Sequence, residues 1–168
     1  MGTPTDRRRI AVRVTPDALR QVKSGHPWLF DHSITSSSHD GEPGDLAVIF
    51  DGDRKFAAVG LFDPDSPIRI KVLHHGRPVT IDGEFWTQRF AAAAERRAQL
   101  VADGDTTGYR LVHGENDQMP GLVVDVYART TVVKLYSAAW FAHLGTIETQ
   151  LAHLLHPERI VLRLARNV

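Results

Sequence analysis

The sequence predicts an α+β fold in two parts: a small, mostly β barrel, followed by a part that mixes helices with strands. Two observations support this prediction. Between residues 10 and 74, apolar and polar residues alternate in short runs with the period of two that is typical of strands. From residue 76 onward, two long segments have apolar residues at helical spacing instead. We therefore expect two domains, over residues 1–75 and 76–168.

The first part should open with a strand and a short helix. Alternation in residues 10–14 predicts the strand. Thr15 is a good helix N-cap, and Pro16 suits the first helical position. Gly25 is placed to end this helix in a left-handed conformation.

The next strands are predicted around one turn. The stretch "GDLAVIFDGDRKFAAVGLFDP" contains two β runs joined by Asp51-Gly52, a dipeptide typical of tight hairpin turns. The stretch "SPIRIKVL" alternates again, whereas the polar segment Ile34–Gly44 is expected to be an exposed loop. Several short strands and one helix predict a small barrel.

The second part should begin with a long helix. Asp82 can cap a helix from about Gly83 to Asp103, and Gly104 is expected to end it. The helix should bury an apolar stripe formed by Phe85, Trp86, Phe90, Ala94 and Leu100 or Val101.

Strands and a second helix should follow. Strand candidates lie near Gly121–Tyr127 and Thr131–Tyr136. The second helix is expected to be capped by Ser137 and to stop before Pro157. Its apolar positions at helical spacing are Trp140, Leu144, Ile147, Leu151 and Leu154.

The final strand, "RIVLRLARNV", runs to the last residue. A strand without a closing turn is typical of a boundary inside a longer protein, and the alternative is a true carboxyl-terminal edge strand. Either way, an unprotected strand edge can promote a homodimer.

Composition and charge narrow the classes of function. The chain has no cysteine, which removes disulfides, thiolate metal sites and a cysteine nucleophile. Ten basic and ten acidic residues stand in each of the two expected domains, so any nucleic-acid-binding face must be local. Of the nine histidines, His74 and His75 are adjacent, and His153 and His156 lie on a helix without an acidic partner at ligand spacing, so no metal site is expected.

Several motifs are absent from the sequence. No apolar run reaches the roughly 18 to 20 residues that span a bilayer, and the start lacks the apolar stretch of a signal peptide, so we expect a cytoplasmic protein without a membrane partner. Neither a glycine-rich phosphate loop nor a G-x-S-x-G elbow occurs, so neither a nucleotide cradle nor that class of hydrolase is indicated.

Two stretches are candidates for RNA contact. In "SGHPWLF", Gly25 and His26 beside Lys23 form a surface suited to a phosphate or a stacked base, while the structural alternative has Trp28 and Phe30 filling the barrel core. The second candidate is the basic run Arg7, Arg8 and Arg9. It is suited to binding nucleic-acid phosphates, and the alternative is a solvated N-terminus without a ligand.

The stretch "YRLVHGENDQMPGLVVDVY" is a candidate substrate-facing site. Glu115, Asp117 and Asp125 are suited to acid–base chemistry, and Arg110 to orienting a phosphate or carboxylate. The structural alternative is an ion pair between Arg110 and one of these acids that locks the loop, because burying a carboxylate without a partner costs too much free energy.

Taken together, "GHPWLF", "PGD", "GLFDPDSPIRIKVL", "FWTQRFAAAAERR" and the stretch above resemble a known family. It is the PUA-domain-containing, S-adenosylmethionine-dependent methyltransferases that make 5-methylcytosine in large-subunit ribosomal RNA. The resemblance implies a PUA-like RNA-binding domain, then a central domain of strand-strand-helix-strand-strand type, with the family's Rossmann-like methyltransferase domain absent from this chain. Gln118-Met119 stand where the family tends to have Gly-Leu, and Val126 where a basic residue is common.

The chemistry of that family limits what this chain is expected to do. Family enzymes use a cysteine thiolate as nucleophile, and this chain has neither a cysteine nor the glycine-rich turn expected to hold the cofactor. We therefore predict an RNA-capturing and substrate-positioning part of a methyltransferase, inactive by itself, with S-adenosylmethionine bound by the missing domain.

Two rival functions stay open. The first is a freestanding RNA-binding module without an enzymatic role. The second is an acid–base enzyme built on Arg110, Glu115 and Asp117.

Overall fold

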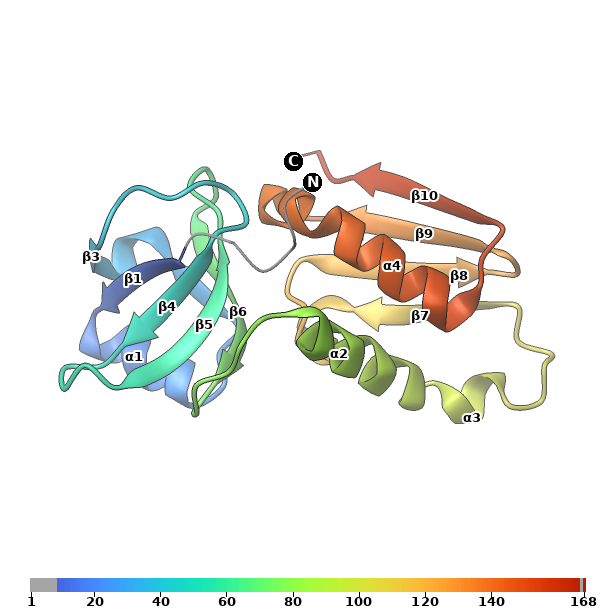
Figure 1. Ribbon diagram of the computed structural model, residues 1–168, viewed down its shortest axis with the longest axis horizontal. Coiled ribbons are helices and arrows are strands. Elements are labelled where there is room, and N and C mark those ends of the chain that lie inside the picture. Colours follow the sequence, from blue (N-terminus) through green and yellow to red (C-terminus); the bar gives the residue numbers. More distant parts are fainter. Residues whose placement is uncertain (1–8, 167) are drawn as a thin grey trace. The chain divides into compact units, whose positions relative to one another are not determined.

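The computed structural model describes residues 9–166 and 168. The chain forms two compact units, one that runs up to Thr80 and includes Ala138–Ala142, and one that comprises Ile81–Ser137 and His143–Val168. The predicted α+β class is confirmed, because each unit combines a sheet with helices (Figure 1).

The first unit is a curled six-stranded sheet with strand order β2-β6-β5-β4-β1-β3. Strand β1 lies between β4 and the edge strand β3, and it pairs parallel to β4 and antiparallel to β3. The elements are β1 (Arg9–Val14), α1 (Pro16–Lys23), β2 (Trp28–Phe30), β3 (Ile34–Ser37), β4 (Leu46–Phe50), β5 (Phe56–Phe62) and β6 (Ile68–His75).

The local signals for helix α1 are confirmed. Thr15 is the N-cap, and its hydroxyl accepts a hydrogen bond from Ala18 N at 3.4 Å. Pro16 is the first helical residue, and Gly25 has a φ of 96° just beyond the helix end. The helix buries Ala18 and Val22, which anchors it to the apolar interior of the sheet.

Two sequence predictions for the first unit are wrong in detail. The β4–β5 hairpin exists, but its turn comprises residues 51–55, and the left-handed residue is Arg54 (φ 62°), not Gly52. The Asp51 carboxylate closes this wider turn by accepting hydrogen bonds from Asp53 N at 3.1 Å and Lys55 N at 2.9 Å. Also, β3 occupies the start of the expected loop, because its backbone pairs with β1.

The second unit is a four-stranded sheet with strand order β10-β9-β8-β7. Helices α2 and α4 lie across one face of this sheet (Figure 1). The elements are α2 (Gly83–Glu95), α3 (Ala98–Val101), β7 (Gly108–His113), β8 (Leu122–Tyr127), β9 (Thr130–Leu135), α4 (Leu144–Leu155) and β10 (Arg159–Leu164).

The order of elements differs from the one that the resemblance implied. Three strands in antiparallel sequence precede α4, and only one strand follows it, so the strand-strand-helix-strand-strand description is wrong for this unit. The reason is geometric: β7, β8 and β9 are joined by short turns, while β10 lies parallel to β9 and needs a crossover helix.

Both predicted helices of this unit are shorter than expected. Asp82 caps α2 as predicted, accepting from Phe85 N at 3.0 Å, but the helix ends at Glu95, and Leu100 is 51% exposed. The second helix starts at Leu144, after a 3-10 turn, and Ser137 does not cap it. Trp140 is fully buried from within that turn.

Candidate nucleic-acid interface

The end of helix α1 presents three of the predicted RNA-contact residues. Lys23 donates to Asp51 Oδ2 at 3.0 Å, so its ammonium group is tied to the β4–β5 turn. The pKa of Asp51 lies below its ordinary value, because Lys55 N and then the Lys23 ammonium stabilise its ionised form. Gly25 lies next in the chain, with its left-handed backbone exposed.

His26 and Trp28 form the rest of this surface. The two rings meet edge to face, with centroids 6.0 Å apart at 82°. Trp28 is 37% exposed, and it is Leu29 that enters the core of the first unit. The interpretation in which Trp28 fills the barrel is therefore wrong, and an aromatic ring lies on the surface beside the helix end.

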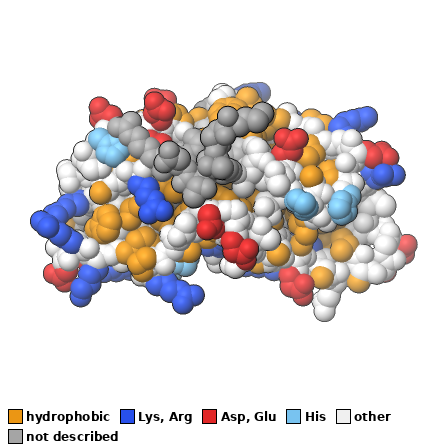
Figure 2. All heavy atoms as spheres, viewed as in Figure 1, with side chains coloured by type: hydrophobic (Ala, Val, Ile, Leu, Met, Phe, Trp, Pro, Cys, Tyr) orange, Lys and Arg blue, Asp and Glu red, His pale blue; other side chains and the backbone are white. Residues whose placement is uncertain are grey.

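The predicted basic run is only partly described. Arg7 and Arg8 lie outside the described residues. Arg9 is exposed at the start of β1, where it pairs with Leu46 of β4. In the view of Figure 2, Lys and Arg side chains gather over the first unit, although basic and acidic residues balance in the sequence of that part.

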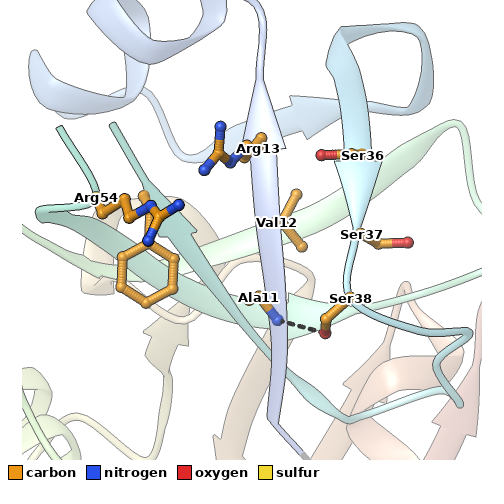
Figure 3. A pocket seen from close by; sticks show the side chains of 8 residues that line it. Ala11, Val12, Arg13, Ser36, Ser37, Ser38 and Arg54 are labelled. Atoms are coloured by element: carbon orange, nitrogen blue, oxygen red, sulfur yellow. Dashed lines mark hydrogen bonds between the residues drawn. The ribbon is translucent and has the colours of Figure 1, made fainter. Parts of the chain in front are cut away.

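The sequence analysis missed a pocket in the first unit. Its volume is about 370 Å³, and it lies between β1, β3 and the β4–β5 turn (Figure 3). Two arginines and three serines contribute polar groups to it. The lining residues are Ala11, Val12, Arg13, Ser36, Ser37, Ser38, Phe50 and Arg54.

In the second unit, Asp117 is a buried carboxylate held by two arginines. Arg97 Nη1 and Nη2 lie 2.6 and 2.7 Å from its two oxygens, and Arg96 Nη1 lies 2.7 Å from Oδ1. His113 N donates to Oδ2 at 2.6 Å. Burial opposes ionisation of Asp117, but the hydrogen bonds from Arg97, His113 N and Arg96 outweigh it, so its pKa is lowered.

This arrangement fixes the chain just beyond the end of α2. Arg97 also donates to Ala93 O at 3.1 Å and to Arg110 O at 3.0 Å. One guanidinium thereby joins the last turn of α2, strand β7 and the 3-10 turn Gly114–Asp117. Both oxygens of Asp117 are engaged, which suits a structural role better than proton transfer.

Arg110 pairs with Asp125, its cross-strand neighbour on β8. Arg110 Nε and Nη2 lie 2.7 and 3.0 Å from the two carboxylate oxygens. The hydrogen bonds from Arg110 to Asp125 raise the pKa of this guanidinium. The pair ties two strands together, whereas Asp117 ties the loop between them.

The four candidates of this stretch thus lie in separate arrangements. Glu115 lies half-buried in the 3-10 turn, where its carbonyl accepts from Gln118 N at 3.0 Å. Asp117 has Arg96 and Arg97 as partners, and Asp125 has Arg110. An acid–base role for this set stays a prediction that the geometry does not favour.

The first unit, a curled β sheet with one short helix, matches a known domain family. Residues 12–75 match the model of the PUA-like domain. The chain therefore carries a PUA-like domain.

The relatives of the chain are ribosomal RNA methyltransferases by name. The "Ribosomal RNA large subunit methyltransferase" of Deinococcus radiodurans is 46% identical over 164 residues, which are 95% of this chain and 40% of the relative. The "Ribosomal RNA large subunit methyltransferase I" of Pseudoalteromonas translucida is 34% identical over 76% of this chain and 32% of the relative. The chain thus spans about two fifths or less of the length of these relatives.

Two solved structures share the fold. A protein of Streptococcus mutans described as a SAM-dependent methyltransferase superimposes with a TM-score of 0.78 over 92% of this chain, at 14% identity. SMU.776, described as a methyltransferase in complex with SAH, gives a TM-score of 0.79 over 96% of this chain, at 15% identity. This chain covers 40% and 41% of those two chains.

One segment of the described residues can be compared with a cofactor-binding turn. The parallel pair β9 and β10, joined through α4, has a strand-helix-strand path, but the segment after β9 reads Tyr136-Ser137-Ala138 and offers no glycine-rich turn. Within residues 9–166 and 168, no group of His, Asp or Glu is arranged for a metal ion, and no helix is long and apolar enough to cross a membrane.

Proposed function

We propose that this chain is the RNA-binding and substrate-positioning part of a SAM-dependent rRNA methyltransferase that makes 5-methylcytosine. The observation that supports it best is the PUA-like domain at residues 12–75, together with relatives named as large-subunit rRNA methyltransferases. In such a protein the chain would capture RNA and hold the target base for a methyltransferase domain, contributing to rate through positioning.

The proposal assigns no bond-making step to this chain. Methylation of carbon 5 of cytosine needs a nucleophile that adds to carbon 6. The family that the chain resembles uses a cysteine thiolate for this step, and the sequence contains no cysteine. S-adenosylmethionine would be held by the domain that the longer relatives contain beyond this part. We further propose that the protein acts in the cytoplasm, where an rRNA substrate is available.

A binding titration tests the RNA-binding part of the proposal. Fragments of large-subunit rRNA would be titrated into the purified chain at two salt concentrations. We expect micromolar or tighter binding that weakens as salt rises, because phosphate contacts release counterions. An rRNA fragment that does not bind at low salt would contradict the proposal.

A methylation assay tests the assignment of catalysis. The purified chain would be incubated with labelled S-adenosylmethionine and rRNA transcript, and no label above a protein-free blank is expected. Incorporation into cytosine by this chain alone would contradict the assignment of catalysis to a further domain.

A freestanding RNA-binding module is the second candidate, favoured by the fact that the PUA-like match is confined to residues 12–75. The two candidates differ in one measurement. If this chain positions the target, adding it to a separately expressed methyltransferase domain of the Deinococcus radiodurans relative should raise methylation of rRNA. An independent module would leave that rate unchanged.

A homodimer through β10 is also proposed. This strand is at the edge of its sheet, and Leu162 and Leu164 are 44% and 48% exposed. An exposed edge with apolar side chains is a template for a second strand. Light scattering should show a dimer in the wild type and a monomer in L162K/L164K, whereas a wild-type monomer at high concentration would exclude this interface.

A further inference from the structure

The pocket between β1, β3 and the β4–β5 turn has two features of an anion site. It is concave, and its volume of about 370 Å³ lies within the range of small-ligand sites, roughly 300–1,000 Å³. Two guanidinium groups contribute to it, from Arg13 in β1 and Arg54 in the turn (Figure 3). Arginine presents a planar set of donors that suits phosphate oxygens.

Both guanidinium groups are available for a ligand. Within the described part of the chain, neither Arg13 nor Arg54 has a hydrogen-bond or ion-pair partner for its side chain. Figure 3 shows the two groups extending to the same side of β1 and toward one another. Two like charges left facing each other without a carboxylate cost stability, and an anion between them would offset that cost.

The backbone holds Arg54 in a conformation that is costly for this residue type. Its φ of 62° is left-handed, a region that favours glycine and costs about 1 kcal/mol or more for other residues. Asp51 maintains this turn through Asp53 N, Lys55 N and the Lys23 ammonium. The side chain at position 54 is thereby directed toward the pocket by a turn that is held at three points.

The other lining groups suit a nucleotide. Ser36 and Ser37 are exposed on β3, and their hydroxyls have no partner among the described residues. The Ser38 hydroxyl already accepts from Ala11 N at 3.1 Å, so it fixes the pocket wall. Phe50 is half-buried and adds an aromatic surface on which a base can stack.

We propose that this pocket binds one nucleotide of single-stranded RNA, with its phosphate between Arg13 and Arg54 and its base against Phe50. The inference rests on the proposed function and adds a site on the β1–β3 side of the barrel, apart from the α1 end that holds Lys23 and His26. It gives this net-neutral domain the local basic face that RNA binding requires.

The test compares two pairs of arginine substitutions within the first unit. The pocket variant is R13A/R54G, in which glycine removes the side chain and also suits the left-handed turn. The matched control is R20A/R77A, which removes two exposed charges outside the pocket. Binding of a fluorescent single-stranded rRNA oligonucleotide would be measured by anisotropy over a range of salt, after thermal melts confirm that each variant folds.

We expect R13A/R54G to weaken binding by about tenfold or more, and the slope of log K against log salt to fall by about 0.7, as for one lost phosphate contact on a single strand. The control should change affinity by less than about threefold. Equal losses in the two variants would overturn the pocket and leave RNA binding intact. Failure of the wild type to bind RNA would instead overturn the proposed function itself.

Two further variants separate the parts of the proposed nucleotide. R13K/R54K keeps both charges but loses the planar donors, so it should retain the salt slope with weaker binding. F50L should weaken binding with an unchanged slope, because stacking does not release counterions. Inorganic phosphate should compete only weakly with the oligonucleotide, and competition at equal concentration would contradict the assignment to RNA.

Discussion

The paired arginines of the second unit differ from the two arginines of the pocket in the first unit, although Arg20 and Arg69 of the first unit also pair with Asp17 and Asp31. In the second unit, Arg96 and Arg97 bind Asp117, Arg110 binds Asp125, and Arg129 lies 2.9 Å from Glu158. In the first unit, the two arginines of the pocket have no such partner among the described residues. Since both halves of the sequence carry equal numbers of acids and bases, net charge conceals this difference.

The difference shows that the role of an arginine depends on whether a carboxylate of the same unit already pairs with its guanidinium group. Arginines paired with carboxylates stabilise the second unit, and each of these positive charges is balanced by a carboxylate of the same unit. Arg13 and Arg54 of the pocket have no carboxylate partner among the described residues, so their guanidinium groups can bind an anion. We therefore expect substitution of the ion-pair residues to lower the stability of the second unit. Substitution of the pocket residues should weaken RNA binding by the first unit.

The largest effect is expected from D117A. Removal of this carboxylate leaves Arg97, whose side chain is only 16% exposed, without its charge partner. Breaking a buried pair by removing one member costs about 3–5 kcal/mol. Urea unfolding of the second unit would measure it, and a loss below about 1 kcal/mol would show that Asp117 does not hold α2, β7 and the loop together.

Asp117 should also make stability depend on pH. Its pKa in the folded chain is below the ordinary value of 3.8, so the stabilisation is present above that value and is lost as pH falls through the lower, folded pKa. The difference in unfolding free energy between wild type and D117A should therefore be constant near neutral pH and shrink below about pH 4. A difference that grows toward acid pH would contradict the lowered pKa.

A smaller effect, on binding only, is expected from D51A. This substitution frees the turn that presents Arg54, and reordering one long side chain costs RNA affinity roughly two- to tenfold. K23A serves as the comparison, because Lys23 is itself a predicted RNA contact that Asp51 now holds. A gain of affinity in D51A together with a loss in K23A would contradict this expectation, because it would show that release of Lys23 outweighs the loss of order at Arg54.

Local signals in the sequence predicted much of the fold. Thr15, Pro16 and Asp82 mark helix starts through hydrogen bonds and φ values that lie within one turn. The β4–β5 hairpin was predicted from two β runs joined by Asp51-Gly52, although the length of the turn depends on the Asp51 side chain. Such features can be predicted from the sequence because the interacting residues lie within a few positions of each other in the chain.

Features that depend on distant partners were missed. Arg97, just beyond the end of α2, binds Asp117 twenty residues further on. Strand β7 was not predicted because its residues give no clean alternation. The pocket joins Arg13 to Arg54 only through the pairing of β1 with β3 and β4. By contrast, the predicted RNA-contact residues Lys23, Gly25 and His26 lie close together because they are near neighbours in the sequence.

The smallest effect is expected from D125A, which breaks the other bidentate pair of the second unit. Arg110 is 46% exposed at its side chain, so water can solvate the guanidinium once its partner is gone. Exposed pairs contribute about 0–1 kcal/mol, and D125A should therefore destabilise far less than D117A in the same urea experiment. If the losses were equal, burial would not distinguish the two pairs. A gain in RNA affinity in D125A would show that Arg110, once released, behaves like the uncommitted arginines of the pocket.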